Sequence, residues 1–271
     1  MIRRPTSRRD LLAGLTALSV LPPAGARASG GPISPWPDGT RAAVSLTYDD
    51  GLDSQLDYAV PELDGRGLKG TFFLTRENME ARLPEWIDLA RRGHEVGDHT
   101  VDHPCALARF SARGFADREL DPMEGFLDAN FGGGRPRTYA YPCGYLGLGG
   151  GGRRRRYARY QRLLRSQFSA ARTTAGRANA PADALTDRFR LHAFEPTYEA
   201  DGVHPAIAYL KDATARGAWA ILVFHDVLPR WRSEGDASVA THRRILDAIA
   251  AQDLWCAPMG EVFGRLAAAR T

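Results

Sequence analysis

The amino-acid sequence predicts an α/β fold in a single domain, a (β/α) barrel of seven to eight parallel strands. Short apolar segments alternate with longer amphipathic segments along most of the 271 residues. Repeated strand-then-helix order implies a parallel sheet with helical crossovers. The length suits one barrel, since such domains run to about 250 residues. An open doubly wound sheet is the alternative that the same pattern allows.

Eight short apolar segments are predicted as strands. They cover residues 43–48, 71–75, 95–98, 137–141, 168–173, 189–194, 219–225 and 254–257. Amphipathic segments between them predict helices over residues 55–66, 84–92, 115–129, 203–216, 238–251 and 261–269. In either architecture, the carboxyl ends of the strands form the edge where a functional site is expected.

The N-terminus has the layout of an export signal. Arg8 and Arg9 form a twin-arginine pair, a mildly apolar stretch follows, and Ala26-Arg27-Ala28 has the pattern of a cleavage site. We therefore expect a periplasmic or secreted protein that uses the Tat export machinery, with no stable membrane insertion after cleavage. The expected segments are a signal peptide at 1–28, a linker at 29–40 and one catalytic domain at 41–268.

The net charge of +4 does not indicate a nucleic-acid partner, because residues 1–28 carry all of it and the remainder is neutral. One basic run remains, where the glycine-rich residues 144–152 lead into Arg153–Arg156. We interpret it as a loop followed by the solvated face of a helix. Binding of an anionic polymer is the alternative, and it would require clustered aromatic residues or a net basic domain.

Polar residues follow four of the predicted strands, at Asp49-Asp50, His99 to His103, Pro142-Cys143 and His225. In a helical turn, the spacing of His99 and His103 would put both rings on one face. Two histidines and one carboxylate are a standard ligand set for catalytic zinc, and they leave a position for water. Each pattern alone is weak, and their occurrence together predicts a catalytic metal site.

The same four segments resemble the motifs of one family. Residues 47–51 (TYDDG), 99–103 (HTVDH), 141–144 (YPCG) and 222–225 (LVFH) are similar, in this order, to motifs of the polysaccharide deacetylases, the NodB-homology group of carbohydrate esterase family four. The resemblance extends over residues 41–263. It implies a distorted, NodB-like (β/α) barrel that hydrolyses N- or O-acetyl groups on a carbohydrate.

The resemblance also implies roles for individual residues. Asp50, His99 and His103 would hold one divalent metal, expected to be Zn²⁺, with Co²⁺ or Ni²⁺ as alternatives. Asp49 would be the general base and His225 the general acid. Cys143 would supply a backbone N–H to the oxyanion. The residues implied for the substrate pocket are Val223, Tyr141 and Pro142.

Two supporting residues of the family have no clear match here. The family often has an arginine before the proline of its third motif, where this chain has Ala140 or Tyr141. Arg190 and His192 are the candidates for that orienting role. Residues 173–198 offer no match to the acid that supports His225.

We further expect Cys105 and Cys143 to lie close together, because both flank the predicted metal site. They could form a disulfide or remain two reduced thiols, and the sequence leaves both alternatives open.

The predicted partner is an acetylated carbohydrate polymer or oligomer, such as chitooligosaccharide, peptidoglycan, exopolysaccharide or acetylxylan. One alternative is a catalytically inactive carbohydrate-binding protein on the same barrel. Such a binding protein would not need both a general base and a general acid. Another alternative is a C–N hydrolase of small amides or cyclic imides.

Overall fold

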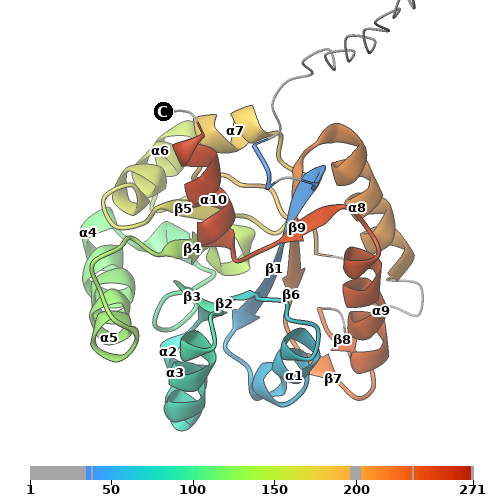
Figure 1. Ribbon diagram of the computed structural model, residues 1–271. Coiled ribbons are helices and arrows are strands. Elements are labelled where there is room, and N and C mark those ends of the chain that lie inside the picture. The colour runs from blue at the N-terminus through green and yellow to red at the C-terminus, as the bar shows by residue number, and fades with distance from the viewer. Residues whose placement is uncertain (1–34, 38, 196–202, 234, 270–271) are drawn as a thin grey trace, which may run out of the picture. The chain divides into compact units, whose positions relative to one another are not determined.

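The computed structural model describes residues 35–37, 39–195, 203–233 and 235–269 (Figure 1). The predicted signal peptide lies outside the described residues. No helix within the described residues has the length and apolar character needed to cross a bilayer. Trp36, from the predicted linker, is buried in the core, and its Nε1 donates a hydrogen bond to the Gly217 carbonyl at 3.1 Å. The packed domain therefore begins before residue 41.

Seven strands form one sheet in the order β5-β4-β3-β2-β1-β6, with β9 also paired to β1 (Figure 1). Every pairing in this sheet is parallel, which confirms the predicted α/β class. The strands are β1 (Ala42–Asp50), β2 (Thr71–Leu74), β3 (Glu95–Asp98), β4 (Thr138–Ala140), β5 (Ala170–Arg172), β6 (Trp219–Phe224) and β9 (Leu254–Cys256).

The sheet is a half-barrel whose open side is spanned by an irregular segment. The strand predicted at 189–194 is wrong. Leu191 forms an isolated bridge with Arg172 in β5, and Phe194 forms one with Leu222 in β6. The segment changes partner within three residues, so it never runs beside either strand long enough to build a ladder. It links the two edge strands and distorts the barrel.

Helices surround the sheet, and all six predicted helical regions are helical (Figure 1). The α-helices are α1 (Val60–Asp64), α2 (Arg76–Met79), α3 (Leu83–Arg91), α4 (Ala112–Phe115), α5 (Asp121–Phe131), α6 (Arg153–Leu164), α7 (Pro181–Thr186), α8 (Val203–Arg216), α9 (Val239–Ala250) and α10 (Met259–Ala268). A small two-stranded sheet, β7 (Val227–Leu228) and β8 (Ala237–Ser238), follows β6.

The two faces of β1 differ, because successive side chains of a strand point to opposite sides. Val44, Leu46 and Tyr48 pack in the largest apolar cluster of the core. The alternate positions Ser45 and Thr47 are polar, and their hydroxyls donate to the carbonyls of residues 257 and 222. Asp49 continues this polar face, so the strand delivers its carboxylate to the side opposite the largest cluster.

One buried polar pair lies on the apolar face. The Tyr48 hydroxyl and His242 Nε2 of α9 share a hydrogen bond of 2.7 Å, and both residues are fully buried. Burial lowers the pKa of His242 from 6.5 to about 3, despite the opposing charge of Glu62. The imidazole is therefore neutral in the folded protein at neutral pH.

Candidate active site

The carboxyl edge of the sheet brings the predicted site residues together. The strand register places Asp50 of β1 and Asp98 of β3 at the same level across β2. His99 follows Asp98 directly, and His225 follows the end of β6, the strand that pairs with β1. Neighbouring parallel strands end at one edge, so residues far apart in the sequence meet there.

Asp50, His99 and His103 form a cluster of potential metal ligands. Their ligand atoms all lie within 4.8 Å of one another. Asp50 Oδ1 is 3.4 Å from His99 Nε2 and 3.7 Å from His103 Nε2, and this oxygen is buried with no hydrogen-bond partner. His99 Nδ1 lies 3.0 Å from the Ala140 carbonyl and donates its proton to it, which leaves Nε2 facing Asp50 with a free lone pair. The donor set fits a divalent cation.

The turn that holds the two histidines is not helical. Residues 99–103 are irregular, with bends at residues 101 and 102, so the rings meet through a tight turn and not through helical spacing. Asp98 accepts a hydrogen bond from the Thr100 amide at 2.7 Å, and the Thr100 hydroxyl accepts one from the His103 amide at 3.0 Å. These bonds bring the two ring centroids to 4.6 Å.

The electrostatics of this cluster favour an ionised Asp50 carboxylate beside a neutral His103 imidazole. Burial raises the pKa of Asp50, but the neighbouring imidazoles of His99, His225 and His103 outweigh it and bring the pKa to about 2. Burial and the nearby His99 lower the pKa of His103. A carboxylate and unprotonated imidazoles are the forms that bind metal.

Asp49 is buried and paired with Arg172. The side chain of Asp49 is 2% exposed and that of Arg172 is fully buried, and Arg172 Nη2 donates to Asp49 Oδ1. The guanidinium also lies over the Phe73 ring, 4.8 Å from its centroid. The other oxygen of Asp49 points toward the metal ligands, 3.7 Å from His99 Nε2. One oxygen is thus fixed by the arginine and the other faces the reaction centre.

Arg172 is the orienting cation that sequence analysis could not assign. It pairs with Ala140 across β4 and β5, so it occupies on the next strand the level at which the resemblance implied an arginine. Neither sequence candidate has this role. Arg190 lines a separate cavity, and His192 Nδ1 is bonded to the Ala175 carbonyl at 3.1 Å. The signal available in the sequence was the charge of Arg172 itself, which lies near the end of the segment predicted as a strand over residues 168–173.

His225 has an acidic partner, Glu195. His225 Nδ1 lies 3.0 Å from Glu195 Oε1, and both side chains are less than a third exposed. Burial lowers the pKa of His225, but the ion pair with Glu195 and the charges of Asp49 and Asp50 outweigh it and raise the pKa to about 9. Gln55 Nε2 donates to the backbone carbonyls of both Asp49 and His225, which ties the ends of β1 and β6 together.

Cys143 is joined to Cys105 by a disulfide with Cα atoms 5.7 Å apart. The predicted closeness is therefore confirmed, and the bridge ties the 142–144 turn to the loop after His103. Gly144 follows with φ 64°, and a β-carbon there would lie 2.5 Å from Thr174 Oγ1, so only glycine fits without displacement.

The three residues implied for a substrate pocket are buried. Tyr141 is a core residue, because its ring packs edge-on against Tyr160 and its hydroxyl donates to the Phe189 carbonyl at 2.8 Å. This corrects its assignment to the pocket. Pro142 and Val223 are buried as well. Their contact with an acetyl group stays a prediction.

Backbone strain collects at this site. Among the described residues, every residue other than glycine with a positive φ belongs to it. They are Asp50 (74°), Thr100 (74°), His103 (48°) and Cys143 (54°). Such conformations cost about 1–2 kcal/mol for a residue with a β-carbon, and they concentrate where a fold holds functional groups.

An open cavity of about 410 Å³ adjoins the site. Its lining begins at Gly51, the residue after Asp50, and includes Asp226, the residue after His225. Tyr58 and Arg232 also line it. It is large enough for a sugar residue, since small-molecule sites span roughly 300–1,000 Å³.

Comparison with known proteins agrees with this geometry. The sequence profile of the family described as "Polysaccharide deacetylase" matches residues 37–147, which include both metal-ligand motifs and Cys143. Residues 37–147 of this chain are therefore similar to the polysaccharide deacetylase family. The resemblance drawn from the four motifs is confirmed.

The individual proteins that this chain resembles are distant in sequence. A peptidoglycan-N-acetylglucosamine deacetylase from Bacillus cereus is 39% identical over 66 residues, which is 24% of each chain. The chain thus matches about a quarter of the length of that relative. The solved structure of a candidate polysaccharide deacetylase from Mycobacterium smegmatis superimposes with a TM-score of 0.64 at 19% identity, over 87% of this chain and 93% of that one.

A further structural neighbour is named as a pseudoenzyme of carbohydrate esterase family four. Its TM-score is 0.53 at 15% identity, over 82% of this chain and 67% of that one. These similarities establish the NodB-like fold of the present chain. Whether this particular chain is active depends on its own residues.

Proposed function

We propose that this protein is a polysaccharide deacetylase, a metal-dependent hydrolase that removes N- or O-acetyl groups from an extracytoplasmic carbohydrate. One observation carries the proposal: a buried Arg172–Asp49 pair lies beside a three-residue metal-ligand set and near the His225–Glu195 pair. A carbohydrate-binding protein has no use for this combination of base, acid and metal ligands.

Asp50, His99 and His103 would hold the cation, which we propose to be Zn²⁺, with Co²⁺ or Ni²⁺ as substitutes. A divalent cation here would polarise the acetyl carbonyl and make a water molecule more acidic. Histidine nitrogens with one carboxylate oxygen are the donor types that zinc prefers. The positive φ of Asp50 and His103 fixes the backbone from which two of the three donors project.

Asp49 would act as the general base. Arg172 holds Oδ1, which leaves Oδ2 to take the proton of the attacking water. The fixed guanidinium limits rotation of the carboxylate, and a base held in place loses no orientation entropy at the moment of reaction. The Cys143 amide would donate to the developing oxyanion, and removal of one such donor typically costs ~3 kcal/mol.

His225 would protonate the leaving amine or alcohol. Glu195 keeps the imidazole protonated, and its contact with Nδ1 leaves Nε2 as the proton donor. Acid and base thus come from different strands, β6 and β1, on either side of the reacting group. The adjoining 410 Å³ cavity offers room for the sugar that carries the acetyl group.

An acetate-release screen would test the proposal, with acetylated chitooligosaccharide, peptidoglycan, exopolysaccharide and acetylxylan fragments and restored Zn²⁺ or Co²⁺. We expect His103→Ala to lose both metal and activity, and Asp49→Asn to lose activity but keep metal. Sugar binding without acetate release would favour the inactive carbohydrate-binding alternative. Release from small amides or cyclic imides alone would favour the second alternative.

We also propose twin-arginine export with cleavage after residue 28. Replacement of both Arg8 and Arg9 by lysine should then keep the protein in the cytoplasm in full-length form. Unchanged export of that double variant would exclude the twin-arginine route.

A further inference from the structure

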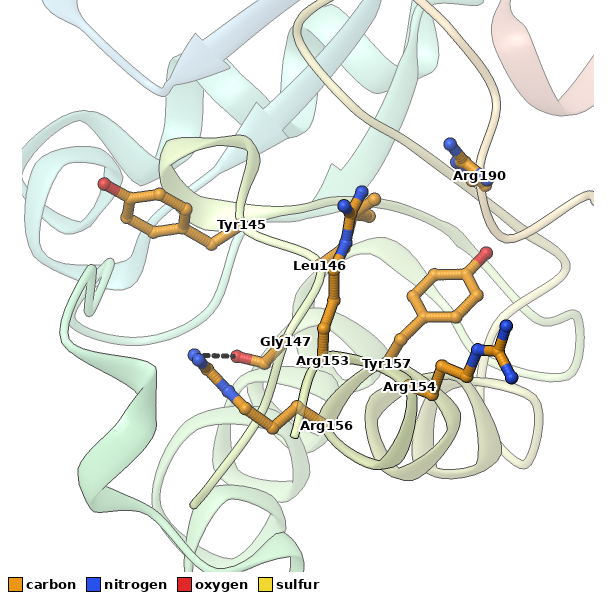
Figure 2. A pocket seen from close by; sticks show the side chains of 8 residues that line it. All are labelled: Tyr145, Leu146, Gly147, Arg153, Arg154, Arg156, Tyr157 and Arg190. Carbon is orange, nitrogen blue, oxygen red and sulfur yellow. Dashed lines mark hydrogen bonds between the residues drawn. The ribbon is translucent and has the colours of Figure 1, made fainter. Parts of the chain in front are cut away.

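A second cavity of about 400 Å³ lies beside the oxyanion turn, and arginine and tyrosine side chains line it (Figure 2). Tyr145, Leu146 and Gly147 form one wall, and they directly continue the Pro142–Gly144 turn. Tyr145 is two residues from Cys143, so their Cα atoms are at most about 7 Å apart. The cavity therefore begins next to the reaction centre.

Four arginines surround this cavity. Arg153 and Arg154 rise from α6, and Arg190 faces them from the segment after α7 (Figure 2). Arg156 turns the other way and supports the wall, because its Nη2 donates to the Gly147 carbonyl at 3.4 Å. Tyr157 lies between them, with its hydroxyl donating to Asp187 at 3.0 Å.

No carboxylate of the described residues neutralises the arginines of this cavity, whereas several other arginines of the protein are paired with acidic side chains. Arg66, Arg82 and Arg137 each pair with two or more carboxylates. Within the described residues, Arg153, Arg154, Arg156 and Arg190 form no ion pair, and α6 contains no acidic residue. Asp187 is the neighbouring carboxylate, and its oxygens are occupied by Tyr157 and by Gln161, a residue of the next turn of α6.

We propose that this cavity binds a carboxylate carried by a sugar next to the acetylated one, so that the preferred substrate is an acidic acetylated polysaccharide. This inference rests on the proposed deacetylase function and specifies its substrate class. The planar guanidinium matches a carboxylate with two parallel hydrogen bonds. Tyr145, which is 56% exposed, and Tyr157 supply the flat surfaces on which sugar rings can lie.

The cavity changes the interpretation of the basic run. As a solvated helix face, Arg153–Arg156 would need no facing partner and no aromatic neighbours. Instead, Arg190 from another segment lines the same cavity as the arginines of the helix, and Tyr145 and Tyr157 line it as well. The cavity has a volume of about 400 Å³, which suits a single acidic sugar better than an extended polyanion.

The test compares acetylated oligosaccharides that contain uronic acid with neutral ones of equal length. The double variant Arg153→Gln with Arg190→Gln should raise KM for the acidic substrate at least about tenfold, because loss of a single charge-assisted hydrogen bond already has that effect. The same variant should leave kcat and KM for the neutral substrate unchanged. The matched control is Arg155→Gln, an exposed neighbour on α6 that does not line the cavity, and it should change neither.

Binding is measured separately from turnover, with a deacetylated uronic-acid oligosaccharide titrated by calorimetry. Wild-type binding that weakens with salt and is lost in the double variant would support the proposal even if no acetyl substrate were hydrolysed. Equal loss in Arg155→Gln, or equally tight binding of inorganic polyphosphate, would assign the effect to general charge attraction and overturn it. No binding of the uronic oligosaccharide by the wild type would also overturn it.

Discussion

Replacement of Glu195 by glutamine should move the alkaline limb of the pH–rate profile to lower pH. His225 must be protonated to act as an acid, so activity is present below its pKa and is lost as the pH rises through that pKa. The Glu195 carboxylate, 3.0 Å away, helps raise that pKa to about 9 against the effect of burial. Removal of its charge therefore lowers the pH at which the acid is lost.

The size of the shift follows from the contacts. The rise from 6.5 to about 9 corresponds to roughly 3.4 kcal/mol, shared among Glu195, Asp49 and Asp50. One carboxylate in direct contact with a histidine typically raises the pKa of that histidine by about 1–2. Glu195→Gln should therefore bring the pKa of His225 to about 7.5. At pH 8 the protonated fraction then falls from about nine-tenths to about one quarter, and kcat/KM falls about fourfold. At pH 6 the two proteins should be nearly equal.

The assay is acetate release measured as kcat/KM between weakly acidic and strongly alkaline pH, since this ratio reports the free enzyme. The bound cation is common to both proteins, so their difference isolates Glu195. Glu261→Gln, an exposed carboxylate on α10, is the control and should leave the profile unchanged. An unmoved alkaline limb in Glu195→Gln would refute the assignment of Glu195 as the partner of the acid.

Three further predictions concern stability and the base. Arg172→Met should reduce the free energy of unfolding by about 3–5 kcal/mol, because it leaves the Asp49 carboxylate buried without a partner, and urea titration should show that adding Asp49→Asn restores part of the loss. Cys143→Ser should cost about 4 kcal/mol of unfolding free energy, because the bridge to Cys105 closes a loop with a separation of 38 residues, and an unchanged urea midpoint would contradict this. The low pKa of His242 predicts that stability is fully present above about pH 6.5 and falls by roughly 3 kcal/mol by pH 4. His242→Gln should flatten that part of the curve, and a variant with the wild-type slope would count against it.

The sequence predicted those parts of the site that lie within one short segment. Asp49 and Asp50 are adjacent at a strand end, and His99 and His103 lie in one turn, so spacing alone indicated their proximity. The strands that carry them were also predictable, because continuous apolar runs are typical of buried parallel strands. The segment 189–194 has the same apolar character, yet it pairs first with β5 and then with β6. The apolar pattern of a segment carries no information about which strands it will pair with.

The supporting residues were not predictable for a related reason. Arg172 reaches Asp49 through the register of β4 with β5, and Glu195 reaches His225 through the irregular segment that closes the barrel. Both contacts depend on which strands are neighbours. A motif search looks for the family's arginine beside Pro142, whereas here the guanidinium enters from the next strand at the level of Ala140.

A laboratory selection for heat resistance alone would act on the left-handed backbone positions of this protein. Glycine adopts that conformation without steric cost, so a change such as Thr100→Gly would relieve strain but remove the side chain that braces the His103 amide. Libraries selected for thermal tolerance should accumulate glycine or asparagine at Asp50, Thr100 and His103 and keep Cys143, whose disulfide stabilises the fold. Libraries selected for turnover should retain the present residues at all four positions. Sequencing both populations would show at which of these positions the strained residue is retained because activity requires it.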